Sequence, residues 1–442
     1  MMRERRRPPA VPGSGSTRRR RPGSRRGGVR PAAVLVLAFA LLTSFLGCGG
    51  DGEDGGKTVT ISASSVGAEA EVLRAQLGRF MEQHPEITVE VRETPDAADQ
   101  RHQLYVQWLN ARGADPDILQ LDVIWTPEFA AAGWVLPLNG FNPDEDDFFA
   151  ATLEANVWRG RLHALPWFAD AGMLYWRTDL VDRAPQTFEE MKALAAGMSE
   201  PEFGFIWQGA RYEGLVCVFL EVLGGFGGRI LDDANRVAVD SPAGVAALEF
   251  LQDGIYEEEL SPEAVLTWQE EPVRFAFQNG SALFMRNWPY AYSLLSDSSD
   301  SRVAGRFAVS AMPAAPGGEP TAALGGSQLA INANSDQPEA AWKVIDFLTQ
   351  PEQMLERARA VGQFPARKSL YASGRLDGVL PVPADDARRV IEAATPRPVT
   401  PVYTELSQTL QVWLHRALTN QVAPEEALEK AAEEMAAVLD VE

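Results

Sequence analysis

The chain has 442 residues and carries a formal net charge of −21, from 61 acidic and 40 basic residues. Eleven arginines and a single glutamate precede Cys48, so a chain that began at Cys48 would carry −31. So acidic a chain repels phosphates and keeps no basic stripe, which argues against nucleic acid binding. Nearly 400 residues remain, more than one hydrophobic core usually serves, so the length predicts two lobes.

The N-terminal segment predicts export. An arginine-rich start leads into an apolar run over 32–46, and a small residue directly precedes Cys48. The run is shorter than the roughly 20 apolar residues of a membrane span. We therefore expect a signal peptide over 1–47, a lipidated Cys48 and a flexible tether over 48–56. A plain anchor helix is the alternative, since Phe45 stands where bacterial lipoboxes usually carry leucine.

Cysteine and histidine are scarce. With Cys48 acylated, Cys217 has no partner, so no disulfide framework is expected. The histidines lack metal-ligand spacing, and each is expected to be a surface or capping residue. They are His84, His102, His163 and His415. The sequence predicts no metal and no other cofactor.

Hydrophobic periodicity predicts an α/β fold. The order strand, helix, strand, helix, strand over 57–123 is typical of a mainly parallel sheet flanked by helices. Further helices are expected at 188–198, 214–223, 243–256, 338–349 and 424–439, and strands at 307–312 and 328–331. The proline-aromatic stretch 165–169 is expected to be too short and irregular for a strand interior.

Three carboxylates follow these segments. Ligands of open α/β sheets bind beyond the carboxyl ends of the strands. Asp122 lies at such an end, Glu69 follows the first strand, and Asp170 follows the stretch 165–169. Each is a candidate acceptor of hydrogen bonds from ligand hydroxyls. Asp122 could instead cap the helix that starts near Pro127, and Glu69 could simply favour a first helical turn.

Aromatic and basic residues complete the candidate site. Trp288 and Tyr290 flank a proline beside Arg286 and Asn287, the mixture of flat faces and planar polar groups that carbohydrate sites need. Closing a seam between two lobes is the alternative. Arg397 stands between two prolines, where it either projects into a site or lies solvated on a stiff linker.

Several motifs follow one another over nearly the whole chain from residue 57. They are Leu121-Asp122-Val123, Leu165-Pro166, Asp170-Ala171-Gly172, Trp207-Gln208-Gly209, Tyr212-Glu213-Gly214-Leu215-Val216-Cys217, Glu271-Pro272-Val273-Arg274, Arg286-Asn287-Trp288-Pro289-Tyr290-Ala291, Leu324-Gly325-Gly326 and Pro396-Arg397-Pro398. With these motifs the chain resembles the trehalose/maltose-binding proteins of bacterial and archaeal ABC sugar importers, within the family of extracellular sugar-binding proteins.

The resemblance implies a two-lobed clamp of the periplasmic-binding-protein fold that closes on a sugar. Lobe 1 would comprise 57–164 with 312–350, lobe 2 would comprise 165–311 with 351–442, and hinge strands would cross between them. Carried over by position, family ligand contacts fall on Glu69, Arg101, Asp122, Asp170, Trp288, Tyr290, Gly326 and Arg397. The partners it implies are two permease subunits with their ATPase, and the expected protein is a monomer.

Two positions depart from the family pattern. Phe168 stands where the trehalose/maltose binders carry a tyrosine, which keeps a stacking face and loses a hydroxyl. Ser327 stands where they carry a tryptophan, which removes an aromatic platform. Both stay candidate ligand residues.

The sequence therefore predicts a lipid-anchored receptor, outside the cell membrane or in the periplasm, for a glucose-containing disaccharide or related glucoside. It is not expected to be an enzyme, and it carries no phosphate-binding Gly-x-x-x-x-Gly-Lys-Ser/Thr loop. The alternatives are a secreted glycoside-acting enzyme with paired carboxylates, a binder of a non-sugar solute, and a peptide-binding or adhesion lipoprotein.

Overall fold

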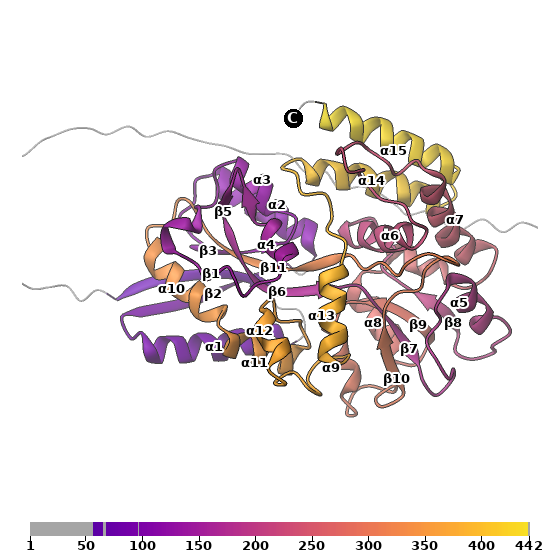
Figure 1. Cartoon of the computed structure of the whole chain (residues 1–442), viewed down its shortest axis with the longest axis horizontal. Helices are drawn as coiled ribbons and strands as arrows, with labels where there is room; N and C mark the ends of the chain where they lie inside the picture. Colours follow the sequence, from indigo (N-terminus) through magenta and orange to yellow (C-terminus); the bar gives the residue numbers. More distant parts are fainter. Residues whose placement is uncertain (1–55, 65–67, 96, 441–442) are drawn as a thin grey trace, which may run out of the picture. The chain divides into compact units, whose positions relative to one another are not determined.

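The computed structural model describes residues 56–64, 68–95 and 97–440 (Figure 1). The signal peptide expected over 1–47, the lipidation expected at Cys48 and all but the last residue of the expected tether lie outside this part of the chain. Within the described ranges, no helix combines the length and the apolar character needed to span a bilayer.

The first sheet has five strands in the order β2-β1-β3-β11-β6. They are β2 (Ile87–Thr94), β1 (Lys57–Ser64), β3 (Ile118–Asp122), β11 (Leu324–Ile331) and β6 (Ala164–Ala171). β1 pairs in parallel with β2 and β3, which confirms the parallel arrangement predicted for 57–123. β11 then runs antiparallel between β3 and β6, so the sheet as a whole is mixed.

The stretch 165–169 is a strand interior, contrary to the prediction. It lies inside β6, an edge strand that pairs only with β11 in this sheet. Pro166 is tolerated because an edge strand needs no ladder hydrogen bond on its outer side. The register shifts between Ser327 and Gln328, so that Ser327 lies opposite Phe168 and Gln328 opposite Pro166. Such an irregularity re-aims side chains near a site.

The second sheet has four strands in the order β10-β7-β9-β8. They are β10 (Phe307–Ser310), β7 (Met173–Arg177), β9 (Ala282–Asn287) and β8 (Phe203–Ile206). β7 is antiparallel to both β10 and β9, and only β8 pairs in parallel, with β9. The expectation of mainly parallel sheets is therefore corrected to mixed sheets. A short hairpin joins β4 (Val157–Trp158) to β5 (Arg161–Leu162).

Helices of one group pack around the first sheet (Figure 1). They are α1 (Glu69–Gln83), α2 (Ala98–Asn110), α3 (Thr126–Ala131), α4 (Ala150–Glu154), α10 (Pro338–Leu348), α11 (Pro351–Val361), α12 (Lys368–Ala372), α13 (Ala384–Ala393) and the 3-10 turn Leu138–Phe141. α1 buries an apolar stripe that includes Leu73, Leu77 and Phe80. α11 packs against α1, where the Gln76 side-chain amide donates to the Gln353 carbonyl at 2.8 Å.

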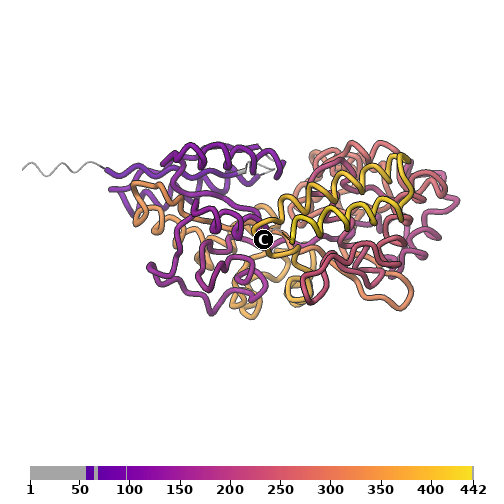
Figure 2. Tube along the Cα trace, turned by 90° about the horizontal axis from the view of Figure 1, so that it is seen from above, coloured from indigo at the N-terminus to yellow at the C-terminus, as the bar shows by residue number. Residues whose placement is uncertain are grey.

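A second group of helices surrounds the second sheet. They are α5 (Phe188–Ala195), α6 (Glu213–Gly225), α7 (Pro242–Tyr256), α8 (Glu270–Gln278), α9 (Ala291–Ser296), α14 (Tyr403–Leu418), α15 (Pro424–Leu439) and the 3-10 turn Glu263–Thr267. α6 is buried on almost every side, as its apolar sequence requires. α14 and α15 lie side by side along their length (Figure 2). The lobe boundaries expected near 165, 312 and 350 stay predictions.

Two histidines are buried rather than superficial, which corrects the expectation for them. His102 Nε2 lies 2.8 Å from a carboxylate oxygen of Glu128, and His163 Nδ1 lies 3.3 Å from a backbone carbonyl. These polar partners let an imidazole be buried. Among the described residues, no group of three or more His, Cys, Asp or Glu side chains could hold a metal ion.

Candidate binding site

A cavity of about 330 Å³ lies between the two sheets, within the size range of small-molecule sites. It is lined from the carboxyl ends of β3 and β6, the start of β11, the starts of α1, α6 and α8, and the segment after β9. All ten candidate residues line it: Glu69, Arg101, Asp122, Phe168, Asp170, Trp288, Tyr290, Gly326, Ser327 and Arg397.

Strand register brings two of the carboxylates to the same end of the first sheet. β11 lies between β3 and β6, with Ser327 opposite Asp122 and Gly325 opposite Asp170. Gly325 and Gly326 have no side chains, and the Trp288 indole lies over Gly325, where a built Cβ would be 3.0 Å from Trp288 Cζ3. A Cβ at Gly326 would lie 2.3 Å from the Phe168 carbonyl oxygen, and its φ of +115° favours glycine.

Asp170 has an incompletely satisfied carboxyl. Its Oδ1 is buried and has no hydrogen-bond partner among the described residues. Burial raises the pKa of Asp170 well above its ordinary value, and the nearby charges of Glu69 and Asp122 add to the rise. Leaving such a group unpaired is costly, so this carboxyl favours a hydrogen-bonding ligand.

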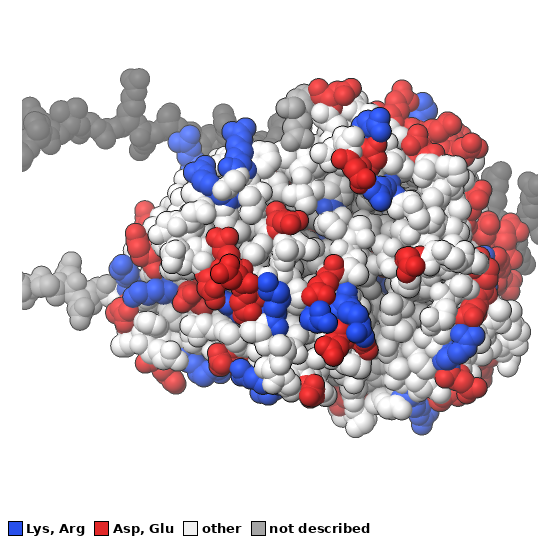
Figure 3. All heavy atoms as spheres, viewed as in Figure 1, with Lys and Arg blue, Asp and Glu red and all other residues white. Residues whose placement is uncertain are grey.

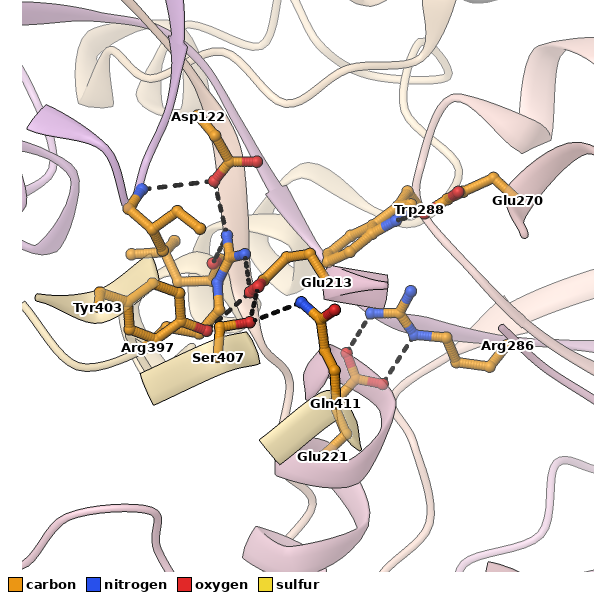
Figure 4. A network of polar contacts seen from close by, with 12 residues as sticks. Asp122, Glu213, Glu221, Glu270, Arg286, Trp288, Arg397, Tyr403, Ser407 and Gln411 are labelled. Atoms are coloured by element: carbon orange, nitrogen blue, oxygen red, sulfur yellow. Dashed lines mark hydrogen bonds and ion pairs between the residues drawn. The ribbon is translucent and has the colours of Figure 1, made fainter. Parts of the chain in front are cut away.

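Arg397 is buried and paired, which excludes the solvated linker arginine (Figure 4). Its Nη2 donates to Asp122 Oδ1 at 3.0 Å, and its Nη1 donates to Glu213 Oε1 at 2.7 Å. Asp122 does not cap the next helix, because α3 begins at Thr126 with Trp125 in the cap position. One guanidinium therefore joins β3 to α6 at the wall of the cavity.

The guanidinium of Arg286 packs against one face of the Trp288 indole. The guanidinium carbon of Arg286 lies 3.9 Å from the Trp288 ring centroid, and Trp288 Nε1 lies 3.4 Å from Glu270 Oε1. Arg286 is held in turn by both carboxylate oxygens of Glu221, and both side chains are fully buried. Gly172 makes room for this pair, since a Cβ there would lie 1.8 Å from Glu221 Oε1. The indole is thus held as a fixed platform.

Tyr290 is fixed by its hydroxyl, which donates to Glu271 Oε1 at 2.8 Å. Glu271 also accepts from the Arg274 guanidinium, at 2.9 Å from Nε. Burial is the main influence on the pKa of Tyr290 and raises it well above its ordinary value, so the hydroxyl stays protonated as a donor. The aromatic pair after β9 is therefore held by acids of α8.

The remaining candidates lie on α1, α2 and β6. Glu69 Oε1 accepts from the Gln363 side chain at 2.6 Å, so Glu69 does more than favour a helical turn. Arg101 Nη1 donates to a backbone carbonyl at 3.1 Å, and its guanidinium carbon lies 5.2 Å from the Trp125 ring centroid. Phe168 is buried, with the Arg357 guanidinium 5.2 Å from its ring centroid.

Further residues line the cavity that were not predicted to bind. They include Gln120, Tyr212, Glu213, Cys217, Glu270 and Glu271. Gln120 Nε2 donates to Ser327 Oγ at 2.9 Å in the floor of the cavity. Side chains alternate between the two faces of a strand, so Gln120 lies on the same face as Asp122. This alternation could have predicted Gln120 as a lining residue. Glu213 belongs to the motif 212–217, but the sequence indicated no role for it.

Charges of both signs are interspersed on the face in Figure 3, which carries no continuous basic patch. The cavity lining itself is rich in carboxylates, hydroxyls and aromatic faces and contains two guanidiniums, of Arg101 and Arg397. Such a lining can accept many hydrogen bonds from hydroxyls and can stack on apolar ring faces. The geometry suits a small polyhydroxylated ligand.

Comparison with known proteins places the chain in a family. Residues 63–355 match the model of the bacterial extracellular solute-binding proteins. A probable ABC transporter-binding protein of Deinococcus radiodurans is 35% identical over 77% of this chain and 84% of its own length. The maltose-bound MalE3 of T. maritima is similar in structure, with a TM-score of 0.82 and 43% identity over 86% of this chain and 99% of that one.

An ABC transporter solute-binding protein from Thermotoga lettingae, bound with α-D-tagatose, has a TM-score of 0.79 and 25% identity over 87% of this chain and 100% of that one. These likenesses confirm the predicted α/β, two-lobed binding-protein fold and the predicted resemblance at the level of the family. The chain therefore belongs to the bacterial extracellular solute-binding protein family.

Proposed function

We propose that this protein captures a glucose-containing disaccharide or related glucoside of the trehalose/maltose kind outside the cytoplasm and delivers it to an ABC importer. Membership of the solute-binding family and likeness to an ABC transporter-binding protein support the general role. The likeness to the maltose-bound MalE3, at 43% identity, supports a glucoside as the ligand.

The observation that carries the proposal is the meeting of Asp170 and Trp288 across Gly325. A Cβ built on Gly325 would lie 3.3 Å from Asp170 Cβ and 3.0 Å from Trp288 Cζ3. A sugar ring has hydroxyls on its edge and C–H groups on its faces. An acid beside a fixed indole can therefore bind the edge and the face of one ring at once.

Capture would proceed by closure of two lobes on the ligand. Asp122, Asp170 and Glu69 would accept hydrogen bonds from ligand hydroxyls. Arg101 and Arg397 would donate hydrogen bonds to ligand oxygens. Trp288, Tyr290 and Phe168 would stack on ring faces, and Gly326 and Ser327 would leave room at the floor. The lobes would comprise 57–164 with 312–350 and 165–311 with 351–442.

The place of action follows from the sequence before residue 57. A signal peptide over 1–47 and a lipid on Cys48 would tether a monomer to the outer face of the cell membrane or in the periplasm. The partners would be a permease and its ATPase, which act on the ligand-bound form. Digestion and mass spectrometry of the membrane-extracted protein tests the anchor: an unmodified Cys48, or a chain that retains residues 1–47, would contradict it.

A thermal-shift screen tests the ligand class. Ligand at about 100 times its Kd stabilises the native state by about 2.7 kcal/mol, so a true ligand raises the Tm clearly. We expect maltose, trehalose or another glucosyl disaccharide to do so, and sorbitol at the same concentration to act as the osmolarity control. A shift for no sugar would contradict the proposal. Release of glucose during incubation would point instead to a glycoside-acting enzyme.

A further inference from the structure

Glu213 is a buried carboxylate at the first position of α6, and it is fully engaged (Figure 4). Its Oε1 accepts from Arg397 Nη1 at 2.7 Å and from the Tyr403 hydroxyl at 2.7 Å. Its Oε2 accepts from the Ser407 hydroxyl, which in turn accepts from Gln411 Nε2 at 3.0 Å. Three partners from outside α6 therefore hold one carboxylate in one orientation.

The start of α6 is closely packed around Glu213. The next residue is Gly214, where a Cβ would lie 2.1 Å from the Tyr212 hydroxyl oxygen. Glu213 itself is only 5% exposed. The buried carboxylate thus links α6 to Tyr403 and Ser407 of α14.

Arg397 transmits this anchoring to the first sheet. A guanidinium is a planar fork, so fixing Nη1 on Glu213 also sets the direction of Nη2. Nη2 reaches Asp122 Oδ1 at 3.0 Å and the Leu324 carbonyl at 3.4 Å. The chain of contacts from Glu213 through Arg397 to Asp122 links a helix of the second sheet to the end of β3.

We propose that Glu213 is a positioning residue for ligand binding: it holds Arg397 so that the guanidinium and Asp122 present one joint surface to the ligand. The inference rests on the proposed function, because it concerns the same cavity. It predicts that Glu213 acts on affinity through Asp122, whereas a merely structural residue would act independently of it.

A double-mutant cycle separates these roles, with Kd for maltose measured by calorimetry. Glu213→Gln is expected to weaken maltose binding by about tenfold or more in the wild-type background, or about 1.4 kcal/mol. In the Asp122→Asn background the same change is expected to cost much less, because a neutral amide pairs with Arg397 much more weakly than the carboxylate does. Equal losses in both backgrounds, within the about twofold scatter of independent sites, would overturn the proposal.

Glu221→Gln is the matched control. Glu221 lies on the same helix and is also buried against an arginine, but its hydrogen bonds come from Arg286 and from the Ala323 N–H. Its effect on maltose affinity is expected to be the same in both Asp122 backgrounds. Coupling of similar size for Glu221 would mean that the cycle reports general softening of α6, and it would overturn the proposal.

Ser407→Ala provides a milder variant if Glu213→Gln does not fold. It keeps every charge and removes one hydrogen bond to Glu213, so maltose affinity should fall by a few-fold, and again less in the Asp122→Asn background. Unchanged affinity would contradict the positioning role. If the wild-type protein binds neither maltose nor another sugar of the screen, the proposed function fails first, and this inference fails with it.

Discussion

Asp122 and Asp170 lie on the two sides of the start of β11, opposite Ser327 and Gly325, yet they differ in their partners. Asp122 is paired with Arg397 at 3.0 Å. Asp170 has a buried oxygen without a partner among the described residues, and burial raises its pKa, with Glu69 adding to the rise. One acid is thus satisfied by the protein, whereas the other lacks a partner that a ligand hydroxyl could supply.

The two acids therefore have different roles in the site. A carboxylate that is already paired contributes to the stability of the cavity wall as well as to recognition. A carboxylate that the protein leaves unpaired lowers stability, and a ligand that satisfies it recovers that loss. The stability–function trade-off of binding sites should therefore be concentrated at Asp170.

Asp122→Ala should have the largest effect, because it acts on stability and affinity together. It leaves Nη2 of the buried Arg397 without its carboxylate, at a cost of about 1–3 kcal/mol in the free energy of unfolding. Ligand affinity should fall as well. Chemical denaturation and calorimetric titration measure the two quantities, and a variant with wild-type stability would contradict the assigned pairing.

Asp170→Ala should separate the two quantities. We expect ligand affinity to fall at least tenfold, about 1.4 kcal/mol, with no loss of stability in the ligand-free protein. Trp288→Ala should reduce affinity by a similar factor, because it removes the platform beside Asp170. Wild-type affinity in both variants, measured by calorimetry, would mean that these residues do not bind the ligand.

Asp170→Asn should give a pH-dependent gain in stability. The pKa of Asp170 is raised in the folded protein above its unfolded value of about 3.9. The folded state then binds more protons, so this group lowers wild-type stability as pH rises from about 4 through its folded pKa. Asparagine does not titrate. The variant should therefore match the wild type near pH 4 and exceed it increasingly toward neutral pH.

Thermal unfolding of both proteins across that pH range measures the difference, in which the other carboxyl groups largely cancel. The ligand should be absent, since its binding would mask the effect. A difference that stays constant with pH, or one that favours the wild type near neutrality, would contradict an unfavourable environment for the Asp170 carboxylate.

The sequence could predict the position of Asp122 because it follows an apolar strand, but not the partner that satisfies it. Arg397 lies 275 residues away and Glu213 lies 184 residues from Arg397, so these pairs depend on the tertiary arrangement. Hydrophobic periodicity located the helix at 424–439, which is confirmed in full. It missed β6, because Pro166 is usually unfavourable in strands and the edge position that tolerates it is set by topology.

The same limit applies to the ion pair that packs against Trp288. The aromatic cluster 286–292 was visible in the sequence, but the buried partner of Arg286 was not, since nothing in the otherwise apolar sequence 214–225 indicates which cation Glu221 meets. The quoted motif Asp170-Ala171-Gly172 contained a signal, because Gly172 is the residue that leaves space for this pair. The reason for a glycine becomes clear only when its neighbours are known.

Gly325→Ala should have the smallest effect, because it changes only the surroundings of Asp170 and Trp288. Its Cβ would lie 3.0 Å from Trp288 Cζ3 and 3.3 Å from Asp170 Cβ, so the indole must shift by a few tenths of an ångström while Asp122 is untouched. We expect affinity to fall by a few-fold and stability to change by less than about 1 kcal/mol. Gly326→Ala is the control: with a φ of +115° and a carbonyl oxygen at 2.3 Å, it should lower stability by about 1–3 kcal/mol. Should Gly325→Ala leave calorimetric affinity unchanged, the ligand would not use the space between Asp170 and Trp288.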